Sequence, residues 1–116
     1  MIIFRKSGNF YQVFDDDAII LHSLFKYKIK DYRVGFPISS IDKVLEKLKE
    51  IHVDYKMGEE ETHFKDNNYN KILIDSKNKI SLEYKINEII DKINNSDYNT
   101  LNELIEVIDK FYNEKR

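Results

Sequence analysis

The chain has no cysteine and no tryptophan, and only one proline and three glycines among its 116 residues. Without thiols it forms neither a disulfide framework nor a thiolate metal site, so a reducing, cytoplasmic compartment is expected. Gly8, Gly35 and Gly58 cannot supply the Gly-x-x-x-x-Gly-Lys pattern of a phosphate-binding loop. The sequence therefore excludes a P-loop ATPase within these residues.

Long apolar runs are also missing. Arg5 and Lys6 interrupt the apolar N-terminal residues too early for a signal peptide. No segment approaches the roughly 20 apolar residues of a membrane span. We expect a cytoplasmic protein without membrane contact.

Charge is nearly balanced, with a formal net charge of -2 at pH 7. Residues 1–58 contain 10 Lys and Arg against 8 Asp and Glu, whereas residues 59–116 contain 9 against 13. A domain that grips many phosphates usually shows a basic excess. Any nucleic-acid binding is expected to be weak and to involve the first half of the chain.

The sequence offers no convincing catalytic or metal-binding pattern. His22, His52 and His63 lack ligand-like spacing, and the acidic runs at 15–17 and 59–61 point consecutive carboxylates in different directions. No glycine-flanked turn surrounds a serine nucleophile. We predict a protein that is not an enzyme and that uses no cofactor and no metal.

The first half of the chain alternates between strand and helix patterns. Residues 2–14 show a period of two, which places Phe10, Gln12 and Phe14 on one face of a strand and Tyr11 and Val13 on the other. A helix is predicted from Asp15 or Asp16 to about Tyr27. A strand over 29–36, a helix over 41–51 and a strand over 53–57 follow.

The second half is predicted to begin with a hairpin, formed by 63–64 and 71–74 around the turn-rich residues 66–68. Helical periodicity starts at Ser81 and breaks at 94–97. The sequence Thr100-Leu101-Asn102-Glu103 matches a capping box that opens a last helix. The two helices predict a C-terminal αα-hairpin.

These elements together predict an α/β (α+β) fold with a single small mixed β-sheet flanked by helices. Residues 1–78 would form the sheet domain, and residues 79–116 would form the helical hairpin packed on the same domain.

One run carries a resemblance to a known family. Gly8-Asn9-Phe10-Tyr11-Gln12, the acidic turn at 15–17, the Gly35-Phe36-Pro37 turn and the helix over 41–51 resemble the N-terminal mismatch-recognition domain (domain I) of MutS-type DNA repair proteins. The resemblance covers about half of the chain. It implies a MutS domain I-like fold and a stand-alone accessory protein that probes unpaired or mispaired bases in DNA repair. A larger protein partner would then supply the chemistry.

The resemblance also assigns residues. The family's wedge phenylalanine falls on Phe10, and the glutamate that bonds the edge of the base falls on Gln12, where an amide replaces the carboxylate. The basic residues expected to steer the nucleic-acid backbone are Lys6, Lys28, Lys30 and Arg33. Phe10 is either this exposed wedge or one more aromatic residue of the core.

The last helix presents an apolar stripe with two alternative roles. It covers the sheet and completes the core, or it binds another protein or a second copy of the chain as a homodimer. The second role defines the alternative function, a protein–protein adaptor that keeps the MutS-like fold without binding nucleic acid. Its partner-binding residues would be Leu101, Leu104, Ile105, Ile108 and Phe111.

Overall fold

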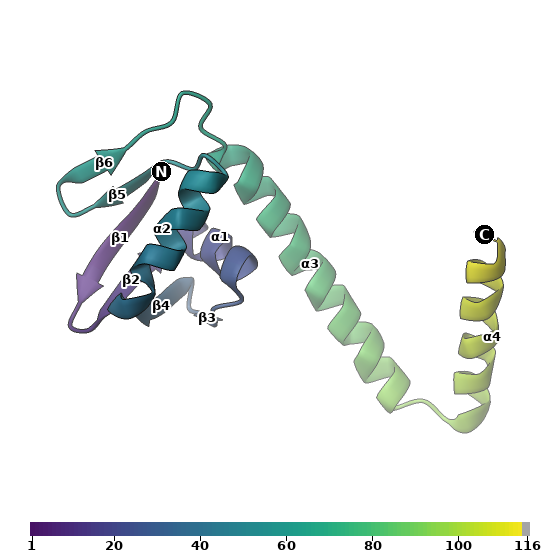
Figure 1. The fold of residues 1–116 in the computed structure, drawn as a ribbon. Coiled ribbons are helices and arrows are strands. Elements are labelled where there is room, and N and C mark those ends of the chain that lie inside the picture. The colour runs from purple at the N-terminus through teal and green to yellow at the C-terminus, as the bar shows by residue number, and fades with distance from the viewer. Residues whose placement is uncertain (115–116) are drawn as a thin grey trace. The chain divides into compact units, whose positions relative to one another are not determined.

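The computed structural model describes residues 1–114 and divides the chain into two compact units, Met1–Ile80 and a second that begins at Ser81. The first unit contains a six-stranded mixed sheet (Figure 1). Its order is β3-β4-β2-β1-β5-β6. The strands are β1 (Ile2–Ser7), β2 (Phe10–Phe14), β3 (Ile29–Lys30), β4 (Arg33–Pro37), β5 (Tyr55–Met57) and β6 (Glu60–Thr62). The mixed α+β class predicted from the sequence is confirmed.

Tight two-residue turns set the register of the antiparallel pairs. Gly8 (φ 58°) turns β1 into β2, and Gly58 (φ 60°) turns β5 into β6, each at a positive φ that glycine adopts without strain. Asp31 (φ 52°) and Tyr32 (φ 57°) form the β3–β4 turn. Within this six-stranded sheet, β1 and β5 are the one parallel pair, with Ile2 opposite Tyr55.

The core lies on one face of this sheet. Its alternate strand residues Ile2, Phe4, Val13, Val34, Phe36 and Tyr55 are buried together with residues of two helices. The helix α1 (Asp16–Phe25) contributes Ala18, Ile20 and Leu21, and α2 (Ile41–Glu50), preceded by the short 3-10 helix η1 (Ile38–Ser40), contributes Val44 and Leu48. The buried residues occupy alternate positions along their strands, so they all lie on one face of the sheet. Both helices pack on that face.

Phe36 is the centre of an aromatic cluster in this core. It is 1% exposed, and its ring lies 6.0 Å from the rings of Phe4 and Tyr11 and stacks 5.4 Å from the ring of Tyr27. Such pairs add about 0.5–1.5 kcal/mol each beyond the burial of their area. The cluster joins β1, β2 and β4 to the segment after α1.

Polar contacts fix the segment that follows α2. The buried carboxylate of Asp54 accepts hydrogen bonds from the Phe64 amide (2.8 Å) and lies 3.0 Å from His63 Nδ1. Burial by itself raises the pKa of Asp54, but these two partners outweigh it and hold the pKa below its ordinary value. The β5–β6 hairpin is thus tied to the loop that leads into α3.

The helix α3 (Tyr69–Asn94) begins in the first unit and continues into the second. Its first turns pack on the core through Tyr69, Ile72 and Leu73. After the connection at 95–97 the chain forms α4 (Tyr98–Glu114). Within residues 1–114, none of the helices is both long enough and apolar enough to cross a bilayer.

Three predicted elements differ from the structure. Residues 71–74 belong to α3, not to a strand, and the hairpin at this edge is β5–β6. The strand predicted over 29–36 is two strands joined by the Asp31-Tyr32 turn. Asp97, not Thr100, caps the start of the last helix, because the Asp97 carboxylate accepts a hydrogen bond from the Thr100 amide at 2.7 Å.

Truncation of two phenylalanines distinguishes the covered face from the uncovered one. Phe36→Ala removes a ring that is 1% exposed, so we expect the free energy of unfolding to fall by about 3–5 kcal/mol. Phe10→Ala removes a ring that is 50% exposed, so the loss should be about 1 kcal/mol or less. Urea titrations of the two variants measure this difference, and equal losses would contradict the one-sided core.

Candidate functional site

The face of the sheet opposite the helices is uncovered within the first unit, and we call it the open face. It is formed by the strand residues that alternate with the buried set. On the three adjacent strands β4, β2 and β1 these are Arg33, Gly35, Pro37, Phe10, Gln12, Phe14, Ile3, Arg5 and Ser7. Two exposed aromatic rings and two arginines thus share one surface.

Phe10, the predicted wedge residue, and Gln12 lie on the open face of β2, the strand between β4 and β1, with Phe10 at the turn that joins β1 to β2. Phe10 pairs with Ser7 on β1 and with Pro37 on β4, and half of its side chain is exposed. Gln12 pairs with Arg5 on one side and with Gly35 on the other. Because Gly35 has no side chain, the amide of Gln12 has the Arg5 guanidinium as its cross-strand neighbour on this face.

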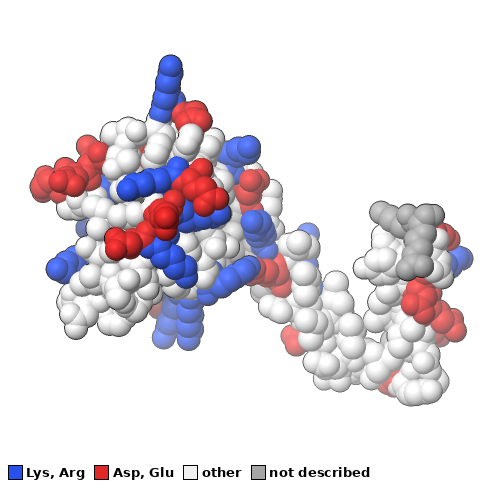
Figure 2. All heavy atoms as spheres, viewed as in Figure 1, with Lys and Arg blue, Asp and Glu red and all other residues white. Residues whose placement is uncertain are grey.

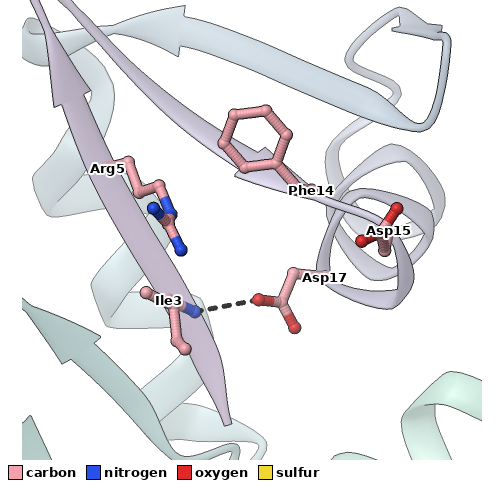
Figure 3. Close-up of a pocket in the computed structure, with 5 residues that line it drawn as sticks. All are labelled: Ile3, Arg5, Phe14, Asp15 and Asp17. Atoms are coloured by element: carbon pink, nitrogen blue, oxygen red, sulfur yellow. Dashed lines mark hydrogen bonds between the residues drawn. The ribbon is translucent and has the colours of Figure 1, made fainter.

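A hollow of about 440 Å³ lies at the end of β2, beside the start of α1. It is lined by Ile3, Arg5, Phe14, Asp15 and Asp17 (Figure 3). The Arg5 guanidinium carbon lies 5.9 Å from the centre of the Phe14 ring, within the range of a cation–π interaction. The hollow therefore combines an apolar ring, a fixed cation and two carboxylates.

Asp17 connects the hollow to the scaffold. Its carboxylate accepts hydrogen bonds from the Ile3 amide (2.9 Å, Figure 3) and from the Tyr69 hydroxyl (2.6 Å). Burial raises the pKa of Asp17, and these two hydrogen bonds only partly oppose that effect. The pKa of Tyr69 is also raised, by its own burial and by the adjacent carboxylate. Asp17 thus holds β1, α1 and α3 together below the open face.

Asp15, the residue between β2 and α1, has an unusual backbone. Its φ of 54° and ψ of -124° lie in a region that favours glycine. The Asp15 amide donates a hydrogen bond to the Tyr32 carbonyl at 2.7 Å, which fixes the start of α1 against the β3–β4 turn. This strained residue lines the hollow directly.

The predicted basic residues are only partly brought together. Lys30 and Arg33 pair across β3 and β4, and Arg33 also pairs with Phe14, so both belong to the open face. Lys6 pairs with Tyr11 and points to the other side of the sheet, and Lys28 lies before β3 in a connecting segment. The cations near the two rings are therefore Arg5, Lys30 and Arg33.

Arg5 and Phe14 are two site residues that the sequence alone did not predict. The alternation of Phe10, Gln12 and Phe14 was a sufficient signal for Phe14. Arg5 required the register of the β1–β2 hairpin, which places it opposite Gln12.

The predicted partner residues lie on α4, where Leu101 and Leu104 are half-buried. The others, Ile105, Ile108 and Phe111, are exposed.

The surface over α2 has a different character. Figure 2 shows lysines and acidic residues intermixed on this side of the first unit. The charges of α2 also alternate in sign along the sequence, at Asp42, Lys43, Glu46, Lys47, Lys49 and Glu50. A surface of mixed sign offers no continuous path for a phosphate backbone. The open face is the better candidate for binding.

Comparisons of the chain with protein-family models, with curated proteins and with solved structures found no match.

The opposite pKa shifts of two carboxylates predict opposite effects of pH on stability. The raised pKa of Asp17 means that its contribution is fully present below about pH 4 and is lost as the pH rises through the raised pKa. The lowered pKa of Asp54 means that its contribution is present above about pH 4 and is lost as the pH falls through the lowered pKa.

Urea titrations at several pH values, with Asp17→Asn and Asp54→Asn as the variants, isolate these effects. The stability of the wild type relative to Asp17→Asn should decrease as the pH rises. Its stability relative to Asp54→Asn should increase. Differences that do not change with pH would show that neither carboxylate has a shifted pKa.

Proposed function

We propose that this protein is a non-enzymatic nucleic-acid-binding module that holds unpaired bases on the open face of its sheet. The observation that carries the proposal is the exposure of Phe10 and Phe14 on the central strand β2, with Gln12 between them and arginines on both sides. Exposed aromatic rings on a sheet, flanked by cations, are the usual platform for single-stranded nucleic acid.

Phe10 and Phe14 supply stacking surfaces. Each ring is at least one-third exposed, at 50% and 37%. Four residues along a strand span about 13 Å, so the two rings take two separate bases. Stacking tolerates any base, since every base has a flat face, and contributes about 1–3 kcal/mol per base.

Gln12 supplies hydrogen bonds to the edge of a base. Its amide both donates and accepts, so it matches several base edges where a carboxylate matches few. Arg5, directly opposite Gln12, adds a donor for a base or a phosphate. The site therefore favours unpaired or mispaired bases over a particular sequence, in line with the resemblance to the MutS mismatch-recognition domain.

The charges of the open face support weak binding. Arg5, Lys30 and Arg33 are available to phosphates, whereas Asp15 and Asp17 at the hollow repel them. Few phosphate contacts mean low affinity and a shallow dependence on salt. A module of this strength acts as an accessory to a larger partner that presents the nucleic acid.

A protein-binding adaptor is the second candidate function. Exposed apolar residues of α4, among them Ile105, Val107 and Ile108, favour it. In that case the open face would have no role in binding nucleic acid. The two candidates differ in whether loss of the Phe10 ring weakens binding to an oligonucleotide.

Phe10→Ala tests the stacking role. We expect the affinity for single-stranded and bulged probes to fall by about 1–3 kcal/mol, because one base loses its stacking partner. Fluorescence anisotropy with single-stranded, bulged, mismatched and fully paired probes measures it. Tyr84→Ala, which removes an exposed ring from α3, is the matched control and should bind like the wild type. Equal affinity of Phe10→Ala and wild type would rule out the stacking platform.

Arg33→Gln tests the contact with the backbone. Loss of one phosphate contact should reduce the slope of log affinity against log salt by about 0.7 on a single-stranded probe. Lys6→Gln removes a cation that points to the other side of the sheet, so its slope should match the wild type. Titrations at three or more salt concentrations give the slopes. Equal reductions of the slope in both variants would mean that cations on both faces of the sheet contribute equally to binding, which would contradict a phosphate contact specific to the open face.

A further inference from the structure

The helices of the second unit carry apolar residues at heptad spacing. In α3 these are Leu82, Ile86, Ile89 and Ile93, and in α4 they are Leu101, Leu104, Ile108 and Phe111. Steps of three and four residues place each set on one side of its helix. We call these two sets the apolar seams.

The apolar surface of α4 is wider than its seam. Ile105, Val107 and Tyr112 occupy the positions on either side of it, and their side chains are 56%, 64% and 64% exposed. A helix with a single neighbour needs only the narrow seam to be apolar, whereas apolar flanks on both sides are typical of a helix packed between two neighbours. Among residues 81–114, the end of α3 is the only other helix beside α4.

The seams are largely uncovered within the unit. The half-buried members Ile93, Leu101 and Leu104 lie near the connection at 95–97. Farther from the connection, Leu82, Ile86 and Ile89 on α3 and Ile108 and Phe111 on α4 are between 43% and 58% exposed. Two helices alone cannot enclose these side chains, but four can.

The distribution of charge on α4 indicates which partner covers the apolar seams. The charged residues of α4 lie away from the seam, on the side formed by Glu103, Glu106, Asp109, Lys110 and Glu114. Figure 2 shows acidic side chains gathered along one side of α4. The flanks of the α4 seam therefore carry no like charges to repel an identical helix, and they offer no charge for a partner of opposite sign to recognise.

We propose that the second unit binds the second unit of another copy of this chain, and that the two pairs of helices form a four-helix bundle. A two-fold interface uses the same surface on both copies, so the uncharged apolar surface of α4 is self-complementary. A stable dimer needs about 800 Å² from each partner, and the eight exposed apolar side chains of the seams and flanks form an apolar surface of this order. The proposal is independent of nucleic-acid binding.

Ile108→Glu tests the interface. By sedimentation equilibrium the wild type should have twice the 14.0 kDa of the chain at high concentration, and Ile108→Glu should have 14.0 kDa throughout. Asn102→Glu adds the same charge on the polar side of α4 and should remain dimeric, as the matched control. A wild type that is monomeric at every concentration, or a dimer that Ile108→Glu leaves intact, would overturn the proposal.

A second measurement does not depend on whether Ile108→Glu folds. The chain has no cysteine, so Asn113→Cys introduces a single labelling site on the polar side of α4. Mixing donor-labelled and acceptor-labelled chains should give energy transfer that disappears when unlabelled wild type is added in excess. Absence of energy transfer at the highest concentration of labelled chain would contradict self-association, whatever the nucleic-acid titrations show.

Discussion

The packing of α1 and α2 on the same face of one sheet is the constraint on which the site depends. A six-stranded sheet has two faces, and the apolar residues of this chain cover only one of them within the first unit. Phe4, Val13 and Phe36 are buried by this arrangement, and the same alternation exposes Arg5, Phe10 and Phe14. Core and open face are therefore two consequences of one strand pattern.

The position of the open face is secured by polar contacts at its edge. Asp17 joins the amide of β1 to the first turn of α1 and to the Tyr69 hydroxyl of α3. Asp54 plays a similar part beside the start of β1, where its backbone carbonyl accepts the Ile2 amide and its carboxylate holds the loop before α3. A partly buried carboxylate that accepts hydrogen bonds from separate elements restrains their relative positions. The rings on β2 are thus presented by a rigid scaffold.

Much of the fold could be predicted from the sequence because its local signals agree. The stripe of α2 and the alternation of β2 each match one period clearly. The failures have physical causes. Asp31-Tyr32 adopts a turn that Asn-Gly usually marks, so the sequence pattern predicts one strand where the structure has β3 and β4. Lys71–Ile74 is too short to distinguish strand from helix by periodicity, and packing of Ile72 and Leu73 on the core favours helix. Arg5 enters the site only through long-range register.

The most direct test of the open face as the binding surface is an NMR titration of the backbone amides with a short single-stranded oligonucleotide. We expect shifts concentrated at Arg5, Phe10, Gln12, Phe14 and Arg33, with little change along α2. Shifts confined to α2, or no shifts when the oligonucleotide is in large excess, would contradict it.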